Sequence, residues 1–207
     1  MLSVGIDPAL NHTGVAILRN GEVLKEKHKP RTWVTNERGI DRLMWLKWKL
    51  VRLIEKEVKE LRSKNEVVWY GVEDYAWNLG KSAHQMGEWG GQIRVTFFEH
   101  DIKLHAIKKR QRLWIINQSE VKKFATGRGI SKKEKLLMDV GSKWGKSFNN
   151  SDEAEAFLMA LMLYWVYALA TGKREPEELA KYQLEVLEKH LARAGLRQKV
   201  VSGRLQD

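Results

Sequence analysis

LSVGIDPALNHTGVAILRNGEVLKEK, residues 2–27, is the stretch that decides the fold of this chain. Its first part, 2–6, alternates and ends at Asp7-Pro8, which predicts a strand that runs into a turn. Asn20-Gly21 then separates the apolar runs 14–18 and 22–27, and this dipeptide between two such runs is the strongest short-range signal for a β-hairpin. The chain is therefore predicted to open with three adjacent antiparallel strands.

Strand and helix patterns alternate in the rest of the chain. Buried strands are predicted over 67–72, which ends at Glu73, and over 112–117. Helices are predicted over 43–61, 81–100, a short segment from Ser119, 131–144, the long apolar stretch from Ser151 to Gly172, and 177–194. Three antiparallel strands followed by strands that alternate with helices indicate an α/β fold with a mixed five-stranded sheet.

Particular residues mark the helices. Ser119 is a good N-cap for its helix. Ser131, with Glu134 three residues later, has the pattern of a capping box. In the earlier helix, Gly87 and Gly91 permit a close backbone approach, as at a helix–helix or dimer contact.

Composition limits the kinds of site that the chain can build. It has 207 residues, 43% of them hydrophobic, which fits one domain with a real core. It has no cysteine, so disulfides and thiolate metal sites are excluded, and a metal must be held by oxygen or imidazole. Residues 156–170 carry no charge but are shorter than the roughly 20 residues of a membrane span, so a helix buried against the sheet is expected. The short apolar start, interrupted by Asp7, predicts no signal peptide and an intracellular, cytoplasmic protein.

Positive charge is concentrated in one segment. The net charge is +11, and residues 103–146 hold 13 Lys or Arg against three acids, a net of +10. A solvated helix face usually mixes signs, so this imbalance favours a surface that faces the phosphates of nucleic acid, with plain solubility as the alternative.

Four acidic residues fall where carboxylates can converge. Asp7 ends the first predicted strand and Glu73 the fourth, whereas Asp152 and Glu155 lie three apart at the start of a helix and share one face. Such a set predicts a site for one or two hard divalent cations, which can drive phosphodiester cleavage. Each acid also has a local interpretation, as part of a turn, a solvent-facing strand end or a favourable helix N-terminus.

Four motifs, in order, resemble those of the RuvC-type Holliday junction resolvases, and of phage-like members in particular, which have a ribonuclease H-like fold. The motifs are GIDPALNHTG at 5–14, VEDYAWN at 72–78, VKKFATGRGISKK at 121–133 and DEAEA at 152–156. The resemblance implies a nuclease domain over 1–172, to which a C-terminal helix and basic tail, 173–207, are appended.

The resemblance also implies an activity and its residues. It implies a homodimeric endonuclease that resolves Holliday junctions and other branched DNA by paired nicks, leaving 5′-phosphate and 3′-hydroxyl ends. It implies two Mg²⁺ or Mn²⁺ ions per site, with Asp7, Glu73, Asp152 and Glu155 as ligands and Lys122 and Lys133 as functional lysines. One departure is the last acid, which is glutamate where aspartate or histidine is commoner.

Further residues are candidates for DNA contact: Thr13, Tyr75, Trp77, Lys81, His84, Lys123 and Lys132. Tyr75 or Trp77 could stack on an unpaired base, and core packing is the alternative for both. Thr13 could bind a phosphate or simply complete the turn.

Other functions fit the same motifs. One is a relaxed nuclease that cuts flaps and replication forks. Another is a ribonuclease H-like enzyme on RNA–DNA hybrids, which the lysine motif disfavours. A third is a DNA-binding protein with a degenerate nuclease fold, which the presence of all four acids disfavours.

Overall fold

A computed structural model describes residues 1–24, 28–63, 66–74, 83–102 and 113–193. The strands are β1 (Leu2–Pro8), β2 (His12–Arg19), β3 (Glu22–Val23), β4 (Arg31–Val34), β5 (Val68–Glu73) and β6 (Leu113–Ile116). The helices are α1 (Gly39–Arg52), η2 (Leu53–Val58), α2 (Lys59–Leu61), α3 (Ala83–Phe97), η4 (Phe98–Ile102), α5 (Gln118–Thr126), α6 (Lys133–Trp144), α7 (Ser151–Ala170), η6 (Pro176–Glu178) and α8 (Lys181–Arg193).

The strands form one mixed sheet in the order β3-β2-β1-β5-β6, which confirms the predicted fold class. β2 and β3 are antiparallel, as the hairpin motif predicts, β1 and β2 are also antiparallel, and β1, β5 and β6 are parallel. The third predicted strand is replaced by two shorter ones. β3 pairs with one end of β2, and β4 pairs with the other end of β2 along the same edge. Pro30, which cannot donate to a strand ladder, lies between the two pieces.

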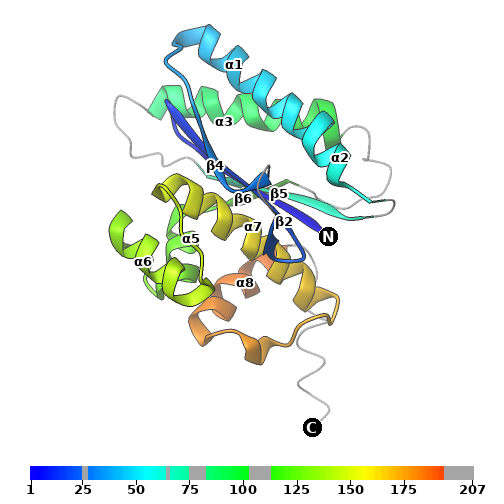
Figure 1. The fold of residues 1–207 in the computed structure, drawn as a ribbon, viewed down its shortest axis with the longest axis vertical. Coiled ribbons are helices and arrows are strands. Elements are labelled where there is room, and N and C mark those ends of the chain that lie inside the picture. Colours follow the sequence, from blue (N-terminus) through cyan, green and yellow to red (C-terminus); the bar gives the residue numbers. More distant parts are fainter. Residues whose placement is uncertain (25–27, 64–65, 75–82, 103–112, 194–207) are drawn as a thin grey trace.

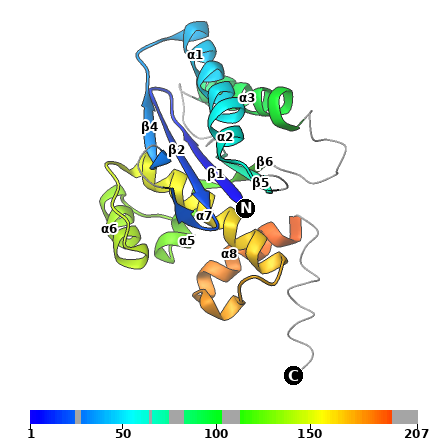
Figure 2. The ribbon, with the colours of Figure 1, turned by 45° about the vertical axis from the view of Figure 1, so that its right-hand side comes forward.

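Helices cover both faces of the sheet. Figures 1 and 2 show α1 and α3 on one face and α7 on the other, with α5, α6 and α8 outside α7. Leu46, Leu50 and Phe97 of the first layer pack with Val4 and Tyr70 of the strands. The second core gathers around α7, which has no charged residue after Glu155.

α7 passes, by length and composition alone, the test for a helix that could cross a membrane. However, 89% of its apolar stretch is buried inside the fold, as expected for the core helix that the sequence predicts. The C-terminal helix α8 joins the same core through Val186, Leu187 and Leu191.

Two helix starts differ from their predictions. The N-cap of α5 is Asn117, not Ser119, and its side chain accepts a hydrogen bond from the Ser119 backbone N–H at 2.9 Å. The capping box predicted at Ser131 is absent from α6, which starts at Lys133 without a side-chain cap. The Ser131 hydroxyl instead donates to the Lys132 carbonyl oxygen at 3.2 Å, and the N-cap position is occupied by Lys132, whose side chain has no acceptor to offer the first turn.

Candidate active site

Two of the predicted acids lie side by side at one end of the sheet. Asp7 is the sixth residue of β1, and Glu73 ends β5, the parallel neighbour of β1. The register pairs Ile6 with Val72, so the next residue on each strand is one of the two acids. Because side chains alternate along strands and the register is in phase, both carboxylates project to the same face of the sheet.

α7 brings a third acid to this face because the strands beneath it carry glycines. A Cβ on Gly5 would collide with the backbone of Ala156, and a Cβ on Gly14 would collide with the backbone of Asp152. These contacts let the first turns of α7 rest directly on β1 and β2, which sets Glu155 over the strand ends.

The carboxylate oxygens of Asp7, Glu73 and Glu155 lie within 4.8 Å of one another. Asp7 and Glu155 are buried, and Glu73 is partly buried. Asp152 is not in this set, and its Oδ1 lies 3.9 Å from the Lys133 Nζ. Glu155 therefore belongs to the cluster, and Asp152 lies at its rim, close enough for its charge to raise the pKa of all three acids.

Glu153 has a structural role. Its carboxylate accepts hydrogen bonds from the backbone N–H of Asn149 at 3.1 Å and from the Asn149 side chain, and its own N–H donates to the Asn150 cap. These bonds hold the start of α7.

Burial and mutual repulsion raise the pKa of each carboxyl group in the cluster. Burial is the largest cause at Asp7, followed by a hydrogen bond and the charge of Glu73, and its pKa lies well above the ordinary value. Burial and the charge of Glu155 also raise the pKa of Glu73. Burial, with the charge of Asp7, raises the pKa of Glu155 to about 7. The charged cluster is therefore unfavourable until cations neutralise it.

The two expected lysines flank the cluster. The charge of Lys122, on α5, lowers the pKa of both Glu73 and Glu155. The charge of Lys133 lowers the pKa of Asp7 from the opposite side, near Asp152. Lys123 points elsewhere, with its Nζ 2.8 Å from the Glu185 carboxylate of α8. Lys132 is exposed just before α6.

The remaining DNA-contact predictions have mixed outcomes. Thr13 is fully buried. Its neighbour Gly14 faces α7, so alternation along β2 turns Thr13 to the opposite face of the sheet, and the predicted phosphate contact is wrong for this structure. His84 is exposed, and its Nε2 lies 3.3 Å from Glu88. Tyr75, Trp77 and Lys81 lie outside the described residues.

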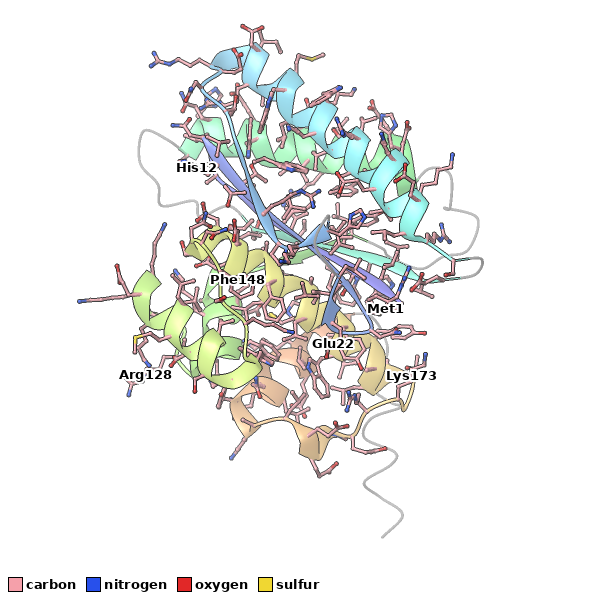
Figure 3. All side chains as sticks on the ribbon, viewed as in Figure 1. Met1, His12, Glu22, Arg128, Phe148 and Lys173 are labelled. Atoms are coloured by element: carbon pink, nitrogen blue, oxygen red, sulfur yellow. The ribbon has the colours of Figure 1, made fainter. Side chains whose placement is uncertain are left out.

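Sequence reasoning missed two polar residues at the cluster. The Gln118 side-chain amide donates to Glu155 Oε2 at 3.5 Å, and it follows directly on the Asn117 cap of α5. His12 lines a pocket of about 400 Å³ with Lys133, Asp152 and the first residues of α6 and α7. Figure 3 labels His12 at the tip between β1 and β2. Its place inside the first motif was the available signal.

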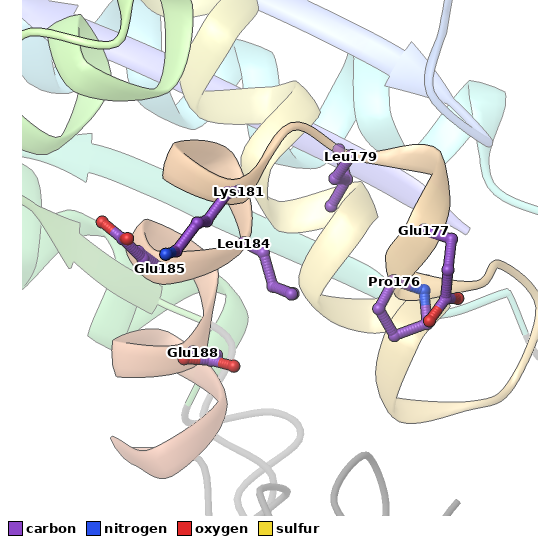
Figure 4. A pocket seen from close by; sticks show the side chains of 7 residues that line it. All are labelled: Pro176, Glu177, Leu179, Lys181, Leu184, Glu185 and Glu188. Carbon is purple, nitrogen blue, oxygen red and sulfur yellow. The ribbon is translucent and has the colours of Figure 1, made fainter. Parts of the chain in front are cut away.

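A second pocket, of about 410 Å³, lies at the C-terminal end of the fold (Figure 4). η6 and α8 form it, with Leu179 and Leu184 on its apolar side and Glu177, Glu185 and Glu188 around it. It contains none of the predicted site residues.

The acidic cluster has the donors that a hard divalent cation prefers. All its donors are carboxylate oxygens, the ligands typical of Mg²⁺ and Mn²⁺. Burial first, and then the charges of neighbouring acids, raise their pKa values, so the ionised carboxylates lack full compensation there. The residues therefore fit one or more bound metal ions.

Comparisons with known proteins support the fold. No protein-family model and no curated protein matches the sequence. Among solved structures, Thermus thermophilus RuvC is similar with a TM-score of 0.56 at 20% identity, covering 81% of this chain and 96% of that one. A structure of T. thermophilus RuvC in complex with a Holliday junction substrate matches with a TM-score of 0.55, also at 20% identity, over 80% and 94% of the two chains. The chain thus has the ribonuclease H-like fold of RuvC.

Proposed function

We propose that this chain is a metal-dependent endonuclease that resolves Holliday junctions and other branched DNA. The observation that carries the proposal is the buried cluster of Asp7, Glu73 and Glu155 at the strand ends of a RuvC-like fold. A similar protein has been solved with a Holliday junction substrate, which supports the choice of DNA.

The acids would hold two Mg²⁺ or Mn²⁺ ions, with Asp152 as a further ligand at the rim. When bound, such ions activate a water for attack on a phosphodiester and stabilise the leaving oxygen. Cleavage that breaks the P–O3′ bond leaves the 5′-phosphate and 3′-hydroxyl ends that the motifs imply.

The surrounding residues would orient the DNA and offset charge. Lys122 lies close enough to Glu73 and Glu155 to change their pKa values, so its ammonium can also offset charge that develops on the phosphate. Lys133 and His12, at the open side of the cluster, can bind the adjacent backbone. Gln118 would fix the Glu155 carboxylate in its ligand orientation.

Paired nicks require two such sites, and the described chain contains one cluster of this kind. We therefore propose a homodimer, in which each chain cuts one strand of the junction.

Cleavage assays on a panel of substrates test the proposal. Purified protein with Mg²⁺ is given a mobile four-way junction, a flap, a replication fork, a linear duplex and an RNA–DNA hybrid. We expect the junction to be cut well above the duplex. Equal cutting of flaps and forks would indicate the relaxed activity, and preference for the hybrid would indicate a ribonuclease H.

Asp7→Asn tests the site itself. The variant should lose at least about 10³-fold in cleavage rate yet still bind the junction, since it removes a metal ligand but no DNA contact. Asp139→Asn is the matched control, because this acid pairs with Lys135 on the surface of α6. Residual cutting by Asp7→Asn at the wild-type rate would refute the assignment.

A further inference from the structure

Ile130 is the most exposed large hydrophobic side chain in the part of the chain that the structure describes, at 91%. An exposed isoleucine forgoes the stabilisation that burial of its side chain would give. Single exposed apolar residues are common, and Met138, at 73%, is another on α6. What distinguishes Ile130 is where the fold holds it.

The loop that carries Ile130, residues 127–132, is fixed to α5. Gly127 ends α5 in the left-handed conformation, with φ 79°. The Thr126 hydroxyl accepts a hydrogen bond from the Arg128 backbone N–H at 3.2 Å. Gly129 then packs on Ser119, with its ideal Cβ position 3.5 Å from the Ser119 Cβ. The loop therefore doubles back along α5 and presents Ile130 from a defined backbone.

This path returns the loop to the start of α5, next to the residue that contacts the acidic cluster. Ser119 follows Gln118, whose amide contacts Glu155. On the other side, Lys133 comes three residues after Ile130, and its Nζ lies 3.9 Å from Asp152. Three residues span at most roughly 11 Å of backbone, so Ile130 lies within that reach of the lysine whose ammonium faces the rim of the proposed cleavage site.

The flanks of Ile130 are cationic. Residues 121–133 contain five Lys or Arg and no acid. Arg128 and Lys132 are exposed and form no ion pair with any described residue. Arg128 lies at the outer edge of the molecule beside α6 (Figure 3). A partner for this loop must combine negative charge with flat apolar surface, which is the combination that phosphates and bases offer together.

We infer that Ile130 is a wedge that inserts between bases of the DNA next to the cleaved phosphate, while Arg128 and Lys132 bind the flanking backbone. This inference rests on the proposed function and adds a residue that opens the substrate. Apolar side chains such as isoleucine unstack base steps in other DNA-binding proteins. Open base pairs at a branch point cost less to unstack than those of a duplex, so the wedge would favour branched DNA.

Base unstacking is measured directly with four-way junctions that carry 2-aminopurine at successive positions around the branch point. The Asp7→Asn protein with Mg²⁺ binds without cutting and should raise the fluorescence at one or two positions. Asp7→Asn/Ile130→Ala should bind within about threefold of it, because the phosphate contacts remain, but lose most of the fluorescence rise. An unchanged fluorescence rise would overturn the wedge.

Cleavage rates provide the second measurement. Ile130→Ala should slow single-turnover junction cleavage by about tenfold or more, since unstacking a step costs a few kcal/mol. Ile130→Leu should retain most of the rate, and Met138→Ala, the matched exposed control, should match wild type. If Met138→Ala slows cleavage as much, removal of any exposed apolar side chain has this effect and the inference fails.

The two proposals fail in different ways. If wild-type protein cuts no branched DNA, the proposed function is wrong. If wild type cuts, Asp7→Asn does not, and Ile130→Ala keeps both the rate and the fluorescence rise, the function stands and the wedge alone is wrong. Unchanged circular dichroism and thermal unfolding of Ile130→Ala would establish that the variant is folded.

Discussion

The two faces of the sheet are covered in different ways. On one face, the backbone of α7 touches the strands at Gly5 and Gly14, where no Cβ could fit. On the other, α1 and α3 stand off the sheet on large side chains such as Leu50 and Phe97. Gly87 and Gly91, on α3, have nothing within 4 Å of an added Cβ.

This difference explains why the acidic cluster forms on the α7 face. Carboxylates have short side chains, so three of them meet only where the backbones that carry them are close together. On the α1 and α3 face, the large side chains between helix and sheet leave a wider separation. The site therefore depends on glycines that carry no chemistry themselves.

The largest effect should follow from Gly5→Ala. The added methyl group would overlap the Ala156 carbonyl and force α7 away from β1. We expect a loss of about 3 kcal/mol or more in the free energy of unfolding. Glu155 would move away from Asp7, so the folded fraction should also bind Mn²⁺ more weakly. Denaturant unfolding and calorimetric metal titration measure the two effects, and wild-type values for both would contradict the close contact.

The next effect is a link between pH, metal and stability on the α7 face. The pKa of Glu155 rises on folding from an ordinary value of 4.5 to about 7, so the folded state favours the protonated acid. Below pH 4.5 this group does not reduce the free energy of unfolding. As the pH rises from 4.5 to about 7, the free energy of unfolding falls by about 3 kcal/mol in the absence of metal.

Two measurements separate this link from other titrations. Glu155→Gln should reduce the loss of stability between pH 5 and pH 8 in EDTA. Mg²⁺ or Mn²⁺ should stabilise wild type much more at pH 8 than at pH 5, because metal binds the deprotonated acids. Equal stabilisation at both pH values would indicate that the cations bind elsewhere.

The smallest effect is expected for Gly91→Ala, the counterpart of Gly5→Ala on the other face. With open space around it, an alanine in α3 should stabilise the chain by about 0.5–1 kcal/mol through helix propensity. The contrary outcome is weaker self-association of the variant in sedimentation experiments. Gly91 would then make a close contact with a second copy of the chain, and both faces of the sheet would depend on glycines.

The sequence predicted the site unevenly. Asp7 and Glu73 were predictable because residues at the carboxyl ends of parallel neighbours must meet at one edge of a sheet. That Glu155 lies in the cluster and Asp152 at its rim was not, because spacing along a helix gives a shared face but not its rotation toward the sheet. The burial of Thr13 was equally hidden, since its motif gives no sign of which face of β2 it occupies.

Local patterns were reliable where they compete with nothing else. Short-range chemistry accounts for the Asn20-Gly21 hairpin, the strand that ends at Glu73 and the buried helix after Asp152. The capping box at Ser131 failed because the fixed loop before α6 decides where that helix starts.

The sequence by itself thus determined the order of the strands and helices, the oxygen-rich donor set and the basic segment, since these depend on residue type and spacing. Only the tertiary structure decided which carboxylates meet, that Lys123 pairs with Glu185 while Lys122 lies near the acids, and that Ile130 stands exposed. The physical reason is that these depend on how closely α7 and α5 approach the sheet and each other, a distance set by contacts between residues far apart in the chain.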